Sequence, residues 1–214
     1  MKTSKLLAGL VLSLTAALAQ ANLLTNGSFE SFSGSFSASN LANNYKLVAA
    51  GNAFIDSWTV GNNSVDVVFN SAYGAITDHS IDIRGGGNGS VAQSFGTTAG
   101  QQYLLNFDLS SNLTGTNTAN AKRLDVSFND VLLQTLYAPI ALAAPSFQSF
   151  YYTATTTGLT TLKFSSYTSA GGQYGAVIDN VSVTAVPEPE TLAMLLAGLG
   201  LMGSIALRRN KSNV

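Results

Sequence analysis

The stretch that decides the fold is Gln102-Tyr103-Leu104-Leu105-Asn106-Phe107-Asp108-Leu109, in which every second residue is apolar. A period of two is typical of a β-strand that buries one face. The segment Arg123-Leu124-Asp125-Val126-Ser127-Phe128 has the same pattern, and Asn129-Asp130 after it predicts a tight turn into Val131-Leu132-Leu133. The centre of the chain is therefore expected to consist of antiparallel strands.

Similar segments lie on both sides of this centre, separated by clusters of Gly, Asn and Ser. They are Ser64–Phe69, Ser80–Arg84, Phe147–Thr155, Thr160–Tyr167 and Ala176–Val183. Seven or more short strands without a helical period predict an all-β fold, in which two antiparallel sheets form a β-sandwich. Trp58 is expected in its core, residues 85–89 in a turn, and residues 31–44 and 110–121 in exposed loops.

The two ends of the chain predict export. Lys2 and Lys5 precede an apolar run and Ala19-Gln20-Ala21, so residues 1–21 are expected to form a signal helix that signal peptidase removes. After a β-sandwich domain at 22–185, the tail 186–214 holds an apolar stretch at 191–207 and a basic stop at 208–211. This stretch is long enough for a minimal transmembrane helix, although physics alone does not decide between a permanent and a temporary anchor.

The tail also carries a specific motif. Pro187-Glu188-Pro189, the glycine-containing apolar stretch and Arg208-Arg209 together resemble the PEP-CTERM sorting signal of Gram-negative bacteria. The resemblance implies that a membrane-embedded exosortase recognises and cuts the tail. It implies an inner-membrane precursor, held by its C-terminal helix, and a mature protein at the cell surface or in the extracellular matrix.

The composition excludes several classes of function. The chain has no cysteine and one histidine, which excludes disulfides, zinc–thiolate sites and thiol catalysis. Residues 22–186 hold nine acidic and five basic residues, a formal charge of −4, which disfavours a nucleic-acid partner. Glu30 is the only glutamate of the domain, and no nucleophile motif accompanies His79, so we expect the protein not to be an enzyme.

The domain itself resembles a known family through an ordered set of segments. The segments are Asn22–Glu30, Ile55–Trp58, Ser80–Ile83, Gly89–Phe95, Gly100–Phe107 and Ile178–Val181. They are similar to the choice-of-anchor C family, which is related to jelly-roll, galactose-binding-like carbohydrate-binding modules. The resemblance implies that Glu30 and Asp179 meet and hold a structural Ca²⁺, helped by carbonyls of Asn26–Ser28. Alternatively, Glu30 caps backbone N–H groups and Asp179 orders the turn into Asn180.

Sugar-binding modules stack aromatic rings on pyranose faces and fix the hydroxyls with polar groups. The candidate rings and polar partners are Tyr45, Tyr73, Tyr137, Tyr151, Tyr152, Tyr167, Tyr174, Arg84, Asn88 and Gln173. Among them Tyr73 and Tyr174, which adjoin glycines, and Arg84 are the preferred ligand-binding residues.

The sequence thus predicts a non-catalytic surface protein that binds extracellular polysaccharide. The alternative is a structural matrix or adhesion protein that binds other proteins or itself. An exposed aromatic platform would favour the first function, whereas unpaired edge strands or an apolar surface patch would favour the second.

Overall fold

The computed structural model describes residues 21–112, 122–138, 145–167, 174–188 and 194–204. The elements are α2 (Ala38–Asn43), β1 (Tyr45–Ala49), β2 (Thr59–Asn62), β3 (Ser64–Phe69), β4 (His79–Asp82), β5 (Gly89–Thr97), β6 (Gln102–Ser111), β7 (Arg123–Phe128), β8 (Val131–Tyr137), β9 (Ser146–Thr153), β10 (Gly158–Ser166) and β11 (Ala176–Ala185). Of the predicted signal helix at 1–21, residues 1–20 lie outside the described residues.

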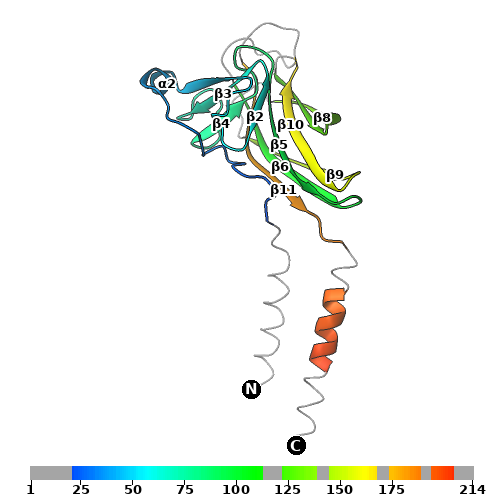
Figure 1. Cartoon of the computed structure of the whole chain (residues 1–214). Coiled ribbons are helices and arrows are strands. Elements are labelled where there is room, and N and C mark those ends of the chain that lie inside the picture. Colours follow the sequence, from blue (N-terminus) through cyan, green and yellow to red (C-terminus); the bar gives the residue numbers. More distant parts are fainter. Residues whose placement is uncertain (1–20, 113–121, 139–144, 168–173, 189–193, 205–214) are drawn as a thin grey trace, which may run out of the picture.

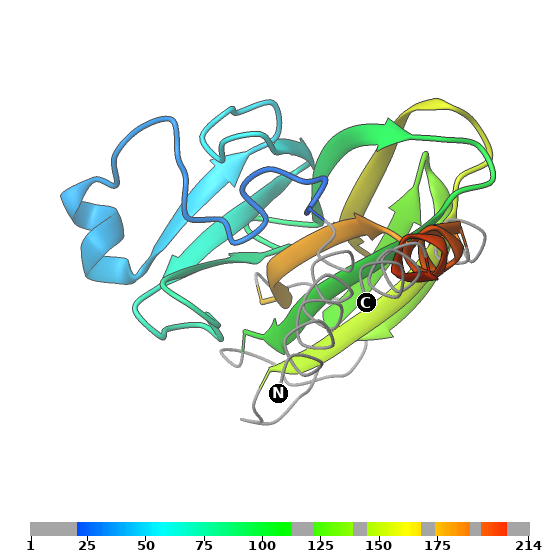
Figure 2. The same ribbon diagram turned by 90° about the horizontal axis from the view of Figure 1, so that it is seen from below.

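The strands form two antiparallel sheets that pack face to face (Figures 1 and 2), which confirms the predicted β-sandwich. One sheet has six strands in the order β1-β3-β4-β11-β6-β9, and the other has five in the order β2-β5-β10-β7-β8. Strands β8 and β9 are therefore edge strands. The predicted Asn129-Asp130 turn is also confirmed, because both residues have positive φ, as a type I′ hairpin turn requires.

The core lies between the sheets and is made by every second residue of the strands. In β6 these residues are Tyr103, Leu105, Phe107 and Leu109, which confirms the alternation predicted for this stretch. Trp58 is 3% exposed, as predicted, and its indole N–H donates to the Asn26 carbonyl at 2.9 Å. We call the side of each sheet that faces away from this core its outer face.

Some local predictions were incomplete. The expected loop at 31–44 contains the short helix α2, and the strands β1 and β2 fall in segments for which no strand was predicted. Of the expected loop at 110–121, residues 110 and 111 belong to β6 and residues 113–121 lie outside the described residues.

The segment before Leu24 and the segment after β11 lie at the same end of the sandwich (Figure 1), where the Leu23 N–H donates to the Val183 carbonyl. In the described part of the chain, the whole core lies between Leu24 and Ala185, so residues 22–186 have what a domain needs to fold alone. The tail is helical at 194–204. No helix among the described residues is long and apolar enough to cross a membrane, and residues 191–193 and 205–207 of the predicted span lie outside them.

Candidate functional site

Glu30 and Asp179 meet at the loop that leads into β4. The Thr77 hydroxyl lies 2.6 Å from Asp179 Oδ2 and 3.3 Å from Glu30 Oε1. Glu30 also accepts the His79 backbone N–H at 2.9 Å and contacts the His79 ring Nδ1 at 2.6 Å, while the Ser80 hydroxyl donates to Asp179. Burial raises the pKa of Asp179, and the nearby Glu30 carboxylate raises it further.

These oxygen atoms are suited to a hard cation such as Ca²⁺, but they also make the contacts that the alternative predicts. Glu30 accepts a backbone N–H, and Asp179 accepts the Asn180 N–H at 2.6 Å. The carbonyls of Asn26 and Gly27 accept hydrogen bonds from Phe29 and Val181. Among the described residues no group of three His, Cys, Asp or Glu side chains is arranged to hold a metal ion, so a cation here would also need Thr77 or carbonyl oxygens.

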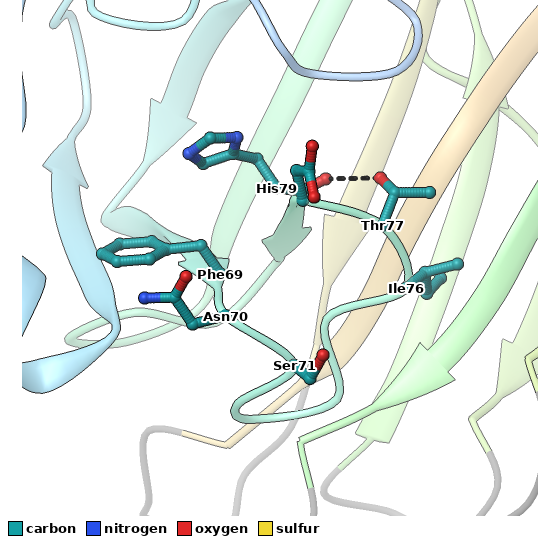
Figure 3. A pocket seen from close by; sticks show the side chains of 7 residues that line it. Phe69, Asn70, Ser71, Ile76, Thr77 and His79 are labelled. Carbon is teal, nitrogen blue, oxygen red and sulfur yellow. Dashed lines mark hydrogen bonds between the residues drawn. The ribbon is translucent and has the colours of Figure 1, made fainter.

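A pocket of about 450 Å³ adjoins this junction (Figure 3). Its lining comes from the end of β3 and the loop to β4, namely Phe69, Asn70, Ser71, Ile76, Thr77, Asp78 and His79. Phe69 and His79 lie along one side and Ile76 and Thr77 along the other. Hydroxyl, amide and carboxylate groups around one phenyl ring can hold a small polar ligand.

The His79 ring is fixed by its surroundings. It stacks on Phe36 with 5.2 Å between ring centres and 18° between planes, and it lies 5.0 Å from the Phe32 ring. Its Nδ1 contacts Glu30. The sole histidine of the chain is therefore a packed structural residue in this geometry.

The preferred ligand-binding residues lie near one end of β6. Gly74, beside Tyr73, packs on the Ser111 carbonyl, and the Asn112 N–H donates to the carbonyl of Gly175, which follows Tyr174. Tyr73 and Tyr174 are half-buried, and the Tyr73 ring packs edge-on against Tyr45 at 5.7 Å. Arg84 is only 5% exposed, so its side chain is enclosed rather than presented to solvent.

A buried polar cluster lies next to Arg84, centred on Asp82. The Asp82 carboxylate accepts the backbone N–H groups of Arg84 and Gly175 and the side-chain amide of Asn112, at 2.8 to 3.0 Å. The Lys122 ammonium, which is fully buried, donates to the Asn112 carbonyl and adds favourable charge. This cluster fastens the β6 end and the segment before β11 to β4.

Asp66 lies directly opposite Asp82 on β3. Desolvation raises the pKa of both carboxyls to about 7, and the charge of Asp82 adds to the effect on Asp66. Asp82 has three N–H donors, whereas Asp66 Oδ1 is buried without a hydrogen-bond partner among the described groups. The donors favour ionised Asp82, so Asp66 is the carboxyl of the pair that keeps its proton below about pH 7.

An aromatic surface lies on the edge strand β9. Phe150 and Tyr152 point inward, where Tyr152 stacks on Phe128 at 4.0 Å. Phe147 and Tyr151 therefore lie on the outer face, and they are 67% and 60% exposed. The sequence interpretation did not single out this pair. Aromatic residues at both odd and even positions of one edge strand nevertheless indicate that some of the rings face away from the core.

Polar groups accompany these rings on neighbouring strands. The Ser149 hydroxyl, between the two rings, contacts Asn106 on β6 at 2.8 Å. Asp108, the partner of Phe147 on β6, accepts the Asn180 side-chain amide at 2.9 Å. We call Phe147, Ser149 and Tyr151 the β9 surface.

Residues 22–184 match the family model described as "Protein of unknown function (DUF642)", which covers more than half of the chain. The chain belongs to the DUF642 family. Residues 185–210 match the PEP-CTERM protein-sorting motif, so the predicted sorting tail is confirmed. This motif implies processing by exosortase and an exported, surface-directed protein. Pro187 and Glu188 follow β11, whereas Pro189, Arg208 and Arg209 lie outside the described residues.

A curated relative of this DUF642 chain is halomucin of Haloquadratum walsbyi, at 33% identity over 177 residues. The match covers 79% of this chain but only 2% of the relative. Among solved structures, a cyclase from Fischerella sp. TAU has a TM-score of 0.51 at 11% identity, covering 79% of this chain and 98% of that one. A CBM35 from Paenibacillus barcinonensis has a TM-score of 0.41 at 14% identity, over 66% and 99%. The cyclase likeness shows the fold alone.

Proposed function

We propose that this DUF642 protein is a non-catalytic, exported carbohydrate-binding protein that associates with extracellular polysaccharide. The observation that carries the proposal is the β9 surface, with two largely exposed rings on one face of an edge strand. Exposed apolar patches rimmed by polar residues mark binding sites, and aromatic faces with nearby polar groups are suited to sugar rings. The sorting tail supports the location, since it directs the protein to the place where such polysaccharide occurs.

The β9 surface suits an extended chain rather than a single sugar. Phe147 and Tyr151 are four residues apart, which is roughly 13 Å at about 3.3 Å per strand residue. Asn106, Asp108 and Ser149 lie beside them and offer both donors and acceptors to hydroxyl groups. Tyr73, Tyr174 and Arg84 form a separate proposed ligand-binding site, in which Arg84 is buried beside the Asp82 cluster.

The proposal includes a structural Ca²⁺ at Glu30 and Asp179, with the Thr77 hydroxyl as a neighbouring oxygen ligand. Two carboxylates that share one hydroxyl, one of them with a raised pKa, support a bound cation. The ion would fasten the N-terminal segment to β11 and would take no part in chemistry.

The proposed route is that of the sorting signal. The precursor is held in the inner membrane of a Gram-negative bacterium by the C-terminal helix, signal peptidase and exosortase cut the two ends, and the domain reaches the surface or the matrix. Arg208 and Arg209 would keep the tail on the cytoplasmic side until processing.

A second candidate function is a matrix or adhesion protein that binds proteins or itself. The edge strand β8 favours it, because Val131 and Leu132 on this strand are 71% and 55% exposed. An exposed apolar edge strand can pair with another chain.

A glycan array with residues 22–186, run with and without Ca²⁺, tests the leading function. Saturable binding that Phe147→Ala/Tyr151→Ala weakens roughly tenfold or more supports it, since stacking on two rings is worth about 1 to 3 kcal/mol. Val131→Ala/Leu132→Ala is the matched control and should leave glycan binding unchanged. If no glycan binds, and the control variant instead abolishes self-association, the second function replaces the first.

A further inference from the structure

A second aromatic surface lies on the outer face of the five-stranded sheet. In β7 and β10 the core residues are Leu124, Val126, Leu162 and Phe164, so Arg123, Asp125 and Tyr167 face outward. Arg123 is paired with Tyr137 across β7 and β8, and Tyr167 follows Ser166, the partner of Leu124 on β10. Tyr137, Arg123 and Tyr167 therefore form one row across three strands.

The rings of this row are open to solvent. Tyr137 is 52% exposed and Tyr167 is 62% exposed. The guanidinium of Arg123 lies over the Tyr167 ring, 5.1 Å from its centre. The two tyrosines are two strand spacings apart, roughly 10 Å at about 4.8 Å per strand. This separation is close to the length of two hexopyranose units in an extended chain.

The arginine between the rings is held in place. Its Nε and Nη2 donate to the two carboxylate oxygens of Asp125, each at 2.8 Å, and the Thr135 hydroxyl donates to the same carboxylate at 2.7 Å. This two-point pairing fixes the plane of the guanidinium. Nη1 is not used in these bonds and is available as a donor to a ligand.

The charges of the row point to a neutral ligand. Arg123 and Asp125 cancel each other, so an anionic sugar would gain little from the arginine and would be repelled by the aspartate. Sugar hydroxyls both donate and accept hydrogen bonds, which matches a guanidinium beside a carboxylate. The occupant that fits is a neutral chain of pyranose sugars lying across the strands.

We propose that Tyr137, Arg123 and Tyr167 form a second glycan-binding surface for neutral polysaccharide, and that the domain thereby bridges two polysaccharide chains. The β9 surface and this tyrosine–arginine row lie on the outer faces of opposite sheets, so one straight chain cannot contact both. The bridging role rests on the proposed function of the β9 surface, whereas binding at the row does not.

Calorimetry with cellohexaose, a neutral β-1,4-linked probe, tests the second surface. Residues 22–186 should bind two molecules per domain, and Tyr137→Ala/Tyr167→Ala should bind one. Tyr137→Phe/Tyr167→Phe keeps the rings and should still bind two. Arg123→Lys keeps the charge but loses the fixed plane, so affinity at the row should fall roughly tenfold. Leu159→Ala, an exposed apolar change on β10, is the control and should bind like the unchanged domain.

Low-shear viscosity of hydroxyethyl cellulose mixed with the domain tests bridging. The unchanged domain should raise the viscosity, and removing either aromatic pair should abolish the rise while one-site binding persists. One bound molecule per domain, lost only in Phe147→Ala/Tyr151→Ala, would overturn the second surface and leave the proposed function intact. One bound molecule lost only in Tyr137→Ala/Tyr167→Ala would overturn the β9 surface instead. Absence of cellohexaose binding to the unchanged domain overturns the row as a neutral-glycan site, and the glycan array then decides the proposed function separately.

Discussion

Replacing Asp66 with asparagine should make the domain more stable above neutral pH and leave it nearly unchanged near pH 4. In the folded domain the pKa of Asp66 is raised from 3.8 to about 7, because the carboxyl is buried beside Asp82. Between pH 3.8 and about pH 7 the unfolded chain releases the proton of Asp66 and the folded domain keeps it. The contribution of Asp66 to stability is therefore fully present below about pH 4 and is lost as the pH rises through about 7.

The magnitude follows from the size of this change in pKa. At about 1.4 kcal/mol per pKa unit, raising one carboxyl from 3.8 to about 7 corresponds to about 4 kcal/mol, an upper value because the two carboxyls share the effect. Asparagine has the shape of the protonated acid and no charge to lose, and its amide can donate toward Asp82. At pH 8 we expect the free energy of unfolding of Asp66→Asn to be about 2 to 4 kcal/mol larger than that of the unchanged domain.

Urea unfolding at pH 4, 6 and 8 measures this difference, with fluorescence of the single, buried Trp58 as the probe. Asp130→Asn is the matched control, since it removes the same charge at the exposed β7–β8 turn and should keep the pH dependence of the unchanged domain. If Asp66→Asn is less stable at pH 8, or loses stability between pH 4 and 8 as steeply as the unchanged domain, Asp66 does not hold the proton.

Three further predictions concern the fold, the cation and the tail. Gly175→Ala would place a methyl group 2.5 Å from Asp82 Oδ1 and should cost about 1 to 3 kcal/mol in urea unfolding, whereas Gly96→Ala, with open space around it, should cost less than 1. Chelation of Ca²⁺ should lower the melting temperature of the unchanged domain but not of Glu30→Gln/Asp179→Asn, and an equal shift in both would return these carboxylates to a capping role. Neutral residues at 208 and 209 should reduce surface display, measured by cell fractionation; normal display would contradict the proposed role of the basic stop.

Alternating residues, bounded by turn residues, predicted the strands β3 and β7 correctly. Residues 64–69, between Asn63 and Asn70, match β3 to the residue, and residues 123–128, which end at Asn129-Asp130, match β7 to the residue. Strand β2, Thr59–Asn62, is four residues long and contains a glycine, so no periodicity can be recognised in it. Its pairing with β5 depends on contacts far along the chain, which local patterns do not contain.

The site was harder to predict than the fold for a related reason. Flanking glycines pointed to Tyr73 and Tyr174 as loop residues, yet the structure leaves both rings half-buried. Tyr137, Tyr151 and Tyr167 were among the candidate rings, but their exposure depends on which face of which sheet they occupy. That Glu30 and Asp179 reach one hydroxyl could be anticipated only through family resemblance, because they are separated by most of the domain.

The tail and the tyrosine–arginine row lie at opposite ends of the domain, so a protein anchored through its tail can still bind polysaccharide at the row. Ala185 pairs with Tyr103 and leads into the tail, so the chain leaves at the end where β10 begins. The row with Tyr167 lies beyond the other end of β10, about nine residues or roughly 30 Å away. A domain held through its tail would therefore keep the tyrosine–arginine row at the end farthest from its anchor. Bridging of two chains does not require release from the envelope, and it would tie the polysaccharide nearest the cell to chains farther out.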